Sequence, residues 1–424
     1  MEPMTVAPAA SQCAASYDEI KPLVELCKAG RLFDVQAWIA SGKPVNLPAP
    51  VNRRHGKSPL DVAIQLGFHS MVQVLLEGGA RIETGGWHDH VTEVLELRRF
   101  DLALLLIKHG FDPKSVDMEA VFMTWDPEIM EYFIEHGADV EAGNPLAFAL
   151  SRRIRTALRI FKQLKDRFPS FQEQANIALR YHCKEGNLKW VSLMLWAGAD
   201  PYAPGSYDYT EERDSDDPGL SALGWAALYR HPEVFDLRNL RLDPKNPALR
   251  EAIGYTDGAD GLRLLVRLLE MGVDPNDQDN GGCSVIQRFL SGMSWQLPCF
   301  DRWGREPARK NIDSSHARDR LKAIHILAKH GAKWIPQDKR ELNEARRSLL
   351  KLTADYAVEF VWIMSKYNAC SRESIDDLIR TPSIKALITK HGPRVAELLS
   401  RWQTDDSARG HPAQSQSESR RVSG

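Results

Sequence analysis

The sequence predicts an all-α protein built from repeated pairs of helices. Apolar residues recur at helical spacing along most of the 424 residues, and few stretches alternate between polar and apolar residues as half-buried strands do. A helix ending that terminates in glycine also recurs along the chain. With 43% hydrophobic and 26% charged residues, the chain has enough apolar side chains to bury a continuous core.

The clearest helix pair is predicted over residues 58–80. Ser58 suits the N-cap of a first helix, and Pro59 suits its first position, where no amide donor is needed. Gly67 and Gly79 can adopt the left-handed conformation that ends each helix. The apolar positions expected to face inward are Leu60, Ala63, Ile64, Val72, Val74, Leu75 and Leu76. One pair cannot bury its own apolar stripe, so neighbouring pairs are expected at a period of about 33 residues.

The same features recur along the chain. Terminal glycines of second helices are predicted at Gly42, Gly110, Gly137, Gly198, Gly272 and Gly331. The turn within a pair recurs at Gly30 and Gly186, and Asn144-Pro145 is predicted to be another capped helix start. The glycine interval roughly doubles after Gly137, so less regular units are expected in the gaps, at 145–167, 221–240 and from 285 onward.

These motifs closely resemble ankyrin repeats over residues 17–335. The resemblance implies an α-solenoid of about nine or ten helix-pair units, whose first helices and loops line a concave surface that binds other proteins. Insertions are expected near 202–218 and 292–320, and a helical C-terminal cap over 336–402. Residues 1–16 and 403–424 are expected to be disordered. The irregular repeats are more similar to those of bacterial ankyrin proteins than to those of vertebrate regulatory ones.

Composition bears on the environment and the partner class. The net charge of −2 argues against a general polyanion binder, because affinity for duplex nucleic acid depends on clustered Lys and Arg. No segment has the length and hydrophobicity of a membrane span or a signal peptide, so we expect a cytoplasmic protein without membrane insertion. Secretion as an effector by another signal stays open. The six cysteines lack a paired spacing, which favours reduced thiols over disulfides or zinc.

Irregular loops are the best candidates for partner contacts, because repeat insertions lie at the surface. Their aromatic and basic residues are typical interface anchors. The candidate partner-binding residues are Arg53, Arg54, Trp87, His88, Tyr207, Tyr209, Trp295, Arg302 and Trp303. The acidic loop after residue 202 lacks the ligand order of an EF-hand, and acidic residues dilute the basic groups of the 292–320 insertion. We therefore expect protein partners, with single-stranded nucleic acid at 292–320 as an alternative, and the oligomeric state stays open.

Catalytic and metal-binding patterns are weak, and we predict no enzyme activity, no cofactor and no metal. His88 and His90 lack an evident third metal ligand, and neighbouring residues such as His182 and Cys183 point in different directions on a helix. The alternative is an enzyme whose site lies in the C-terminal helices, where the polar candidates are Asp355, Tyr356, Glu359 and His391. His109, His136 and His330 each precede a terminal glycine, a position favourable for a donor at a helix C-terminus.

Overall fold

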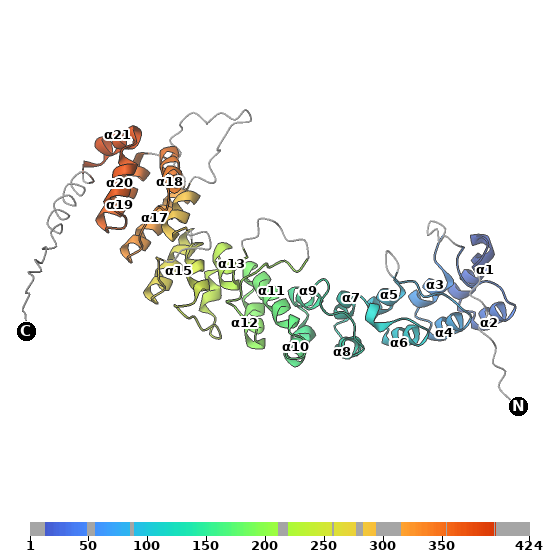
Figure 1. Ribbon diagram of the computed structural model, residues 1–424. Helices are drawn as coiled ribbons and strands as arrows, with labels where there is room; N and C mark the ends of the chain where they lie inside the picture. Colours follow the sequence, from blue (N-terminus) through green and yellow to red (C-terminus); the bar gives the residue numbers. More distant parts are fainter. Residues whose placement is uncertain are drawn as a thin grey trace, which may run out of the picture. The chain divides into compact units, whose positions relative to one another are not determined.

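The computed structural model describes residues 13–48, 56–84, 89–210, 219–256, 258–276, 283–293, 315–352, 354–393 and 395. Within these ranges all regular secondary structure is helical, apart from two isolated bridges, which confirms the predicted fold class (Figure 1). The chain divides into two compact units. Unit 1 comprises Met1–Tyr181, Leu193–Asp200 and Ser206–Asp217, and unit 2 comprises His182–Ser192, Pro201–Gly205 and Pro218–Gly424.

Unit 1 is a stack of helix pairs. Its pairs are α1 (Tyr17–Lys28) with α2 (Leu32–Ala40), α3 (Pro59–Gln65) with α4 (His69–Glu77), α5 (His90–Glu96) with α6 (Phe100–Lys108), α7 (Met118–Met123) with α8 (Pro127–Glu135), and α9 (Pro145–Ser151) with α10 (Arg155–Leu164). The first helices α1, α3, α5, α7 and α9 pack in sequence, and the second helices α2, α4 and α6 do the same. Parts of the next pair, α11 (Ser170–Lys184) and α12 (Leu188–Ala197), also belong to this unit.

Unit 2 repeats the arrangement. It contains α13 (Ala222–Leu228), the short 3-10 helix η3 (Pro232–Asp236), α14 (Pro247–Ile253), α15 (Gly258–Glu270), α16 (Val285–Gly292), α17 (Ser315–Lys329), α18 (Lys339–Lys351), α19 (Ala354–Lys366), α20 (Arg372–Ile379) and α21 (Pro382–His391). In the part of the chain that is described, the pairs from α1/α2 to α16/α17 number nine, as the sequence predicted. The insertion predicted at 292–320 overlaps the start of α17, which begins at Ser315, and its residues 294–314 are outside the described ranges.

The C-terminal helices continue the stack. Helix α18 packs on α16, and α19 packs on α17; α20 and α21 then pack on α18 and α19 in the same order. Trp334, which is fully buried, connects the two regions: its indole N–H donates to Gln287 Oε1 at 2.8 Å, and its ring meets that of Phe360 edge-on at 5.3 Å. The region expected to cap the repeats is therefore built as further helix pairs.

Helix starts agree with the sequence at one site and differ at another. Ser58 caps α3 as predicted, and Asp61 completes a capping box, since Ser58 N–H donates to its Oδ2 at 2.7 Å. Asn144 was predicted to cap α9, and this is wrong. Asn144 has a left-handed backbone with φ of 52°, and its side-chain amide donates to the Tyr209 carbonyl at 3.1 Å instead. Pro145 still begins the helix because its fixed φ suits the first position.

The predicted terminal glycines have the expected conformation. Every one has a positive φ, from 72° at Gly42 to 104° at Gly110 and Gly198. Consecutive helix pairs are also joined by a recurring asparagine. Asn46 donates to the Gly79 carbonyl at 2.9 Å and accepts from Arg81 N–H at 2.8 Å, and Asn276 makes the corresponding bonds to Gly331 at 3.2 Å and Lys333 at 2.7 Å. Each asparagine thus satisfies backbone groups that follow the second helix of the next pair.

Candidate protein-binding site

The described part of the candidate site is the start of the loop that follows α12. Tyr207 and Tyr209 lie there, and both are half-buried. The other candidate contacts lie outside the described residues: Arg53, Arg54, Trp87, His88, Trp295, Arg302 and Trp303. The described part of the site thus consists of residues 206–210 and the unit 1 helices that hold them.

A buried arginine of α11 holds this loop. Arg180 is fully buried, forms an ion pair with Glu173, and donates from Nε to the Ser206 carbonyl at 2.6 Å. Within the loop, Ser206 Oγ accepts from Asp208 N–H at 3.0 Å, and Asp208 accepts from Thr210 N–H at 2.9 Å. Because a buried guanidinium needs its hydrogen bonds satisfied, the contact with Ser206 fixes the loop to α11.

Tyr209 fastens the loop to α9. Its ring contacts the Phe148 ring edge-on at 5.6 Å between centroids, and its carbonyl accepts from Asn144 as described above. The guanidinium of Arg152 lies 5.2 Å from the centroid of the same Phe148 ring. Tyr209 therefore supports the loop from within unit 1, so Tyr207 and the exposed Asp208 are the better candidates for contact with a partner.

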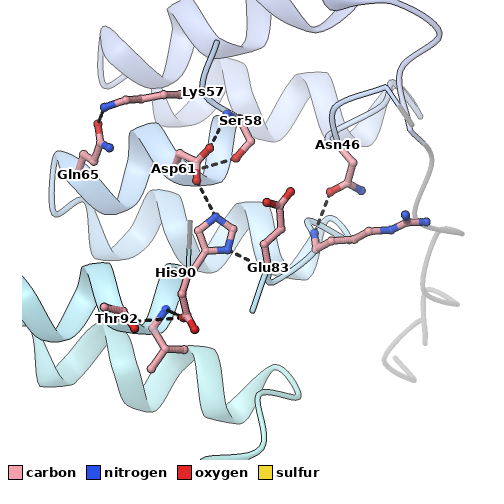
Figure 2. A network of polar contacts seen from close by, with 11 residues as sticks. Asn46, Lys57, Ser58, Asp61, Gln65, Glu83, His90 and Thr92 are labelled. Atoms are coloured by element: carbon pink, nitrogen blue, oxygen red, sulfur yellow. Dashed lines mark hydrogen bonds and ion pairs between the residues drawn. The ribbon is translucent and has the colours of Figure 1, made fainter. Parts of the chain in front are cut away.

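His90, considered above as a metal ligand, is part of a buried polar network (Figure 2). Its Nε2 lies 2.8 Å from Asp61 Oδ1, and its Nδ1 accepts from Glu83 N–H at 2.9 Å. Since Nδ1 is an acceptor, the proton is on Nε2, which donates to Asp61. Both ring nitrogens are thus used inside the fold. Among the described residues, no group of three or more His, Cys, Asp and Glu side chains is placed to hold a metal ion.

The other histidines with chemical interest also have structural partners. His136 Nδ1 lies 2.7 Å from the Tyr132 carbonyl, and His330 Nδ1 lies 2.8 Å from the Ile326 carbonyl, one turn back in each helix. They therefore interact with helix C-termini, as predicted. His182 is buried and stacks on Trp190 at 5.4 Å, and burial strongly raises the pKa of the neighbouring Cys183 thiol, which disfavours its nucleophilic thiolate.

The structure describes the side chains of three of the four C-terminal polar candidates. Asp355 and Glu359 are exposed on α19, whereas Tyr356 on the same helix is buried. The side chain of His391 lies outside the described part of the chain. Exposed carboxylates of this kind are typical of a solvated helix face.

The turns within helix pairs hold further residues of interest that were not predicted from the sequence. In three of these turns the left-handed residue is glycine, but Arg98, Trp125, Arg153 and Arg230 occupy the same place with φ between 55° and 68°. They can be identified by their position, because each is the left-handed residue of its turn, the place that Gly30, Gly67 and Gly186 occupy in the other turns.

Across the described ranges, no helix combines the length and apolar character needed to span a bilayer.

Comparisons with known proteins give weak structural similarities. Neither the protein-family models nor the curated protein sequences give a match. The human ASB11 ankyrin repeat domain is 19% identical, with a TM-score of 0.35, and the alignment covers 56% of this chain and 98% of that domain. The ankyrin repeat domain of Bcl-3, described as a unique member of the IkappaB protein family, is 17% identical with a TM-score of 0.28. That alignment covers 62% of this chain and 92% of the Bcl-3 chain. At TM-scores this low, the repeat architecture rests on the helix pairs and turns described above.

Proposed function

We propose that the protein is a non-catalytic scaffold that binds a partner protein. The observation that carries this proposal is the use of the buried Arg180 to fix residues 206–210 against α11, where Tyr207 is half-buried and Asp208 is exposed. Burying a charged side chain is costly, so a loop fixed in this way is prepared for recognition. The stacked helix pairs supply a rigid support, and rigid supports with irregular loops are typical of binding proteins.

The chemistry of the described residues favours binding over catalysis. His90, Asp61 and Arg180 are engaged in joining helices and loops. Large apolar side chains, in contrast, are exposed: Phe33 is 83% exposed and Trp196 is 65% exposed. Because aromatic side chains supply much of the affinity at protein interfaces, this distribution supports a protein partner.

The predicted contacts outside the described residues remain part of the proposal. Arg53, Arg54, Trp87 and His88 would contribute from the N-terminal loops, and Trp295, Arg302 and Trp303 from the insertion after α16. An adaptor, effector or immunity-type role in a bacterial cytoplasm is the finer form of the proposal, which follows from the sequence resemblance.

Affinity capture of the tagged full-length protein tests the proposal. We expect quantitative mass spectrometry to identify a stoichiometric protein, and we expect the triple variant Tyr207→Ala, Trp87→Ala, Trp303→Ala to retain less than about a tenth of it, as for interface anchors. Tyr209→Phe is the matched control, because it keeps the ring contact with Phe148 and should capture the partner normally. Circular dichroism checks that each variant is folded. If no stoichiometric protein is captured, or if capture is equal in the folded triple variant, the proposed site is wrong.

A further inference from the structure

The turns within helix pairs have one shared geometry. The first helix is followed by a C-cap residue with helical backbone, the next residue is left-handed, and the third is the N-cap of the second helix. The left-handed residue donates its N–H three residues back: Arg98 to Leu95 at 2.9 Å, Trp125 to Phe122 at 3.2 Å and Arg153 to Leu150 at 3.0 Å. This is the place where a helix C-terminus favours glycine, since a Cβ strains the left-handed backbone.

At two of the places that glycine occupies, the neighbouring turn lies close to it. A Cβ on Gly30 would lie 3.6 Å from the Phe68 ring, and one on Gly67 would lie 2.5 Å from Arg99 Nη1. Arg99 also donates from this nitrogen to the Gly67 carbonyl at 2.9 Å, so consecutive turns lie side by side. The N-cap residue of the second helix of one pair thus lies against the glycine of the preceding pair.

Three consecutive turns of unit 1 lack this glycine. They follow α5, α7 and α9, whose successive packing places their turns next to one another. Their left-handed residues are Arg98, Trp125 and Arg153, and all three side chains are exposed. All three positions carry the backbone strain of a non-glycine residue while their side chains are exposed, as is typical of strain at a recognition surface.

We call Leu97, Arg98, Met123, Trp125, Arg152 and Arg153 the turn ridge. Its apolar members are substantially exposed, at 43% for Leu97, 44% for Met123 and 45% for Trp125. None of its three arginines forms an ion pair within the described part of the chain.

Acidic residues near the turn ridge only partly offset its charge. Asp101 pairs with Arg99 at 2.7 Å, and Asp126 caps α8 by accepting from Glu128 N–H at 2.9 Å, while Glu96 is exposed at the end of α5. Glu119 attracts Arg152, whose guanidinium also lies against the Phe148 ring, so Arg98 and Arg153 are the arginines that present positive charge beside apolar surface.

We propose that the turn ridge is a second docking surface, which binds an acidic segment of a partner protein that also carries apolar side chains. Carboxylates of that segment would pair with Arg98 and Arg153, and an apolar side chain would cover Trp125. The inference rests on the proposed scaffold function and deepens it by naming the chemistry of the partner. Its test changes residues other than Tyr207, so the two proposals can fail independently.

Fluorescence anisotropy with synthetic peptides tests this surface on the full-length protein. The probe is a labelled 15-residue peptide of alternating Glu and Leu with one central Trp. Two comparison peptides replace every Glu by Lys or every apolar residue by Gly. The variant is Arg98→Gly, Trp125→Gly, Arg153→Gly, in which glycine relieves the left-handed strain and therefore preserves the fold. Arg230→Gly, the same change in unit 2, is the matched control.

We expect the acidic apolar peptide to bind the wild type and Arg230→Gly equally. The triple glycine variant should bind it at least tenfold more weakly while its melting temperature stays equal or rises, and the comparison peptides should bind at least tenfold more weakly to the wild type. Equal binding to the triple variant, or no binding of the acidic peptide, overturns the proposal. Tighter binding of a single-stranded 15-nucleotide DNA that depends on the same residues also overturns it, in favour of a nucleic-acid ligand.

Discussion

His90 donates its Nε2 proton to Asp61 Oδ1 across a distance of 2.8 Å, although 29 residues separate them in sequence. Asp61 at the same time caps its own helix through Ser58, and His90 accepts from Glu83 N–H. The pair therefore connects the first turn of α3 to the first turn of α5. Asp61 thus both caps its own helix and helps to position the next helix pair.

Removing the imidazole should destabilise unit 1. His90→Ala leaves a buried carboxylate and the Glu83 N–H without their partner, and we expect a loss of about 2–3 kcal/mol in the free energy of unfolding. Chemical denaturation measures it. A double-mutant cycle with Asp61→Asn should give a coupling of about 1–3 kcal/mol. Additive effects would show that the two side chains do not stabilise each other.

The Asp61–His90 pair predicts that the free energy of unfolding depends on pH in the acidic range. Burial would raise the pKa of Asp61, but the hydrogen bonds that it accepts from His90 and Ser58 lower it from 3.8 to about 2. A lowered pKa means that the folded state binds fewer protons than the unfolded state. The stabilisation is therefore complete above about pH 4 and is lost as pH falls towards 2, by about 2 kcal/mol. Between these values the wild type should lose that much more stability than Asp61→Asn, and parallel curves would contradict the assignment.

The fold was predictable because its signals are local. Ser58 and Pro59 mark a helix start, and Gly67 and the terminal glycines mark helix ends, whatever the rest of the chain does. Asn144 shows the limit of this approach. It precedes a proline and resembles a cap, but a loop 65 residues away provides the carbonyl of Tyr209 as its partner. Sequence spacing alone does not reveal such a competing partner.

The contacts of the candidate residues were less predictable because they join different helix pairs. Asp61 and His90 carry no recognisable spacing, and their pairing follows from the way α3 and α5 stack. Tyr209 was singled out as an aromatic in an irregular loop, but its contact with Phe148 on α9 becomes visible only in three dimensions. The chemistry of a residue type is readable from sequence, whereas its availability depends on the packing.

Substituting two glycines of unit 1 by alanine should distinguish the cost of backbone strain from the cost of close packing. At Gly110, with φ of 104°, no atom lies within 4 Å of an added Cβ, so Gly110→Ala should cost about 1–2 kcal/mol through left-handed strain alone. At Gly67 an added Cβ also meets Arg99, so Gly67→Ala should cost more. Denaturation of both variants gives the comparison, and Arg99→Ala in the Gly67→Ala background should recover part of the difference. Equal costs would mean that Arg99 adjusts freely.

The cysteines should divide sharply in reactivity. Burial raises the pKa of Cys27 and Cys370 to about 12 and also raises that of Cys183, whereas Cys13 and Cys283 are partly exposed. Because the thiolate is the reactive form, an alkylating reagent at pH 8 should modify the buried three only after unfolding. Peptide mass spectrometry after labelling in buffer and in denaturant identifies each site. Rapid native labelling of Cys27, Cys183 or Cys370 would contradict the packing around it.

Trp334 determines whether the repeats can be separated from the C-terminal helices. Its ring is enclosed with Phe360 of α19, so Trp334→Ala should cost about 3–5 kcal/mol, as for other buried tryptophans. Trp334→Phe keeps an aromatic ring but removes the N–H that Gln287 accepts, and we expect about 1–3 kcal/mol. A chain ending at residue 335 would expose this ring, and its tryptophan emission should shift to longer wavelength together with a lower melting temperature. If the shortened chain keeps the emission and melting temperature of the full-length protein, α18–α21 are a separate domain. If both change as expected, binding assays must use the full-length chain, because the scaffold extends to α21.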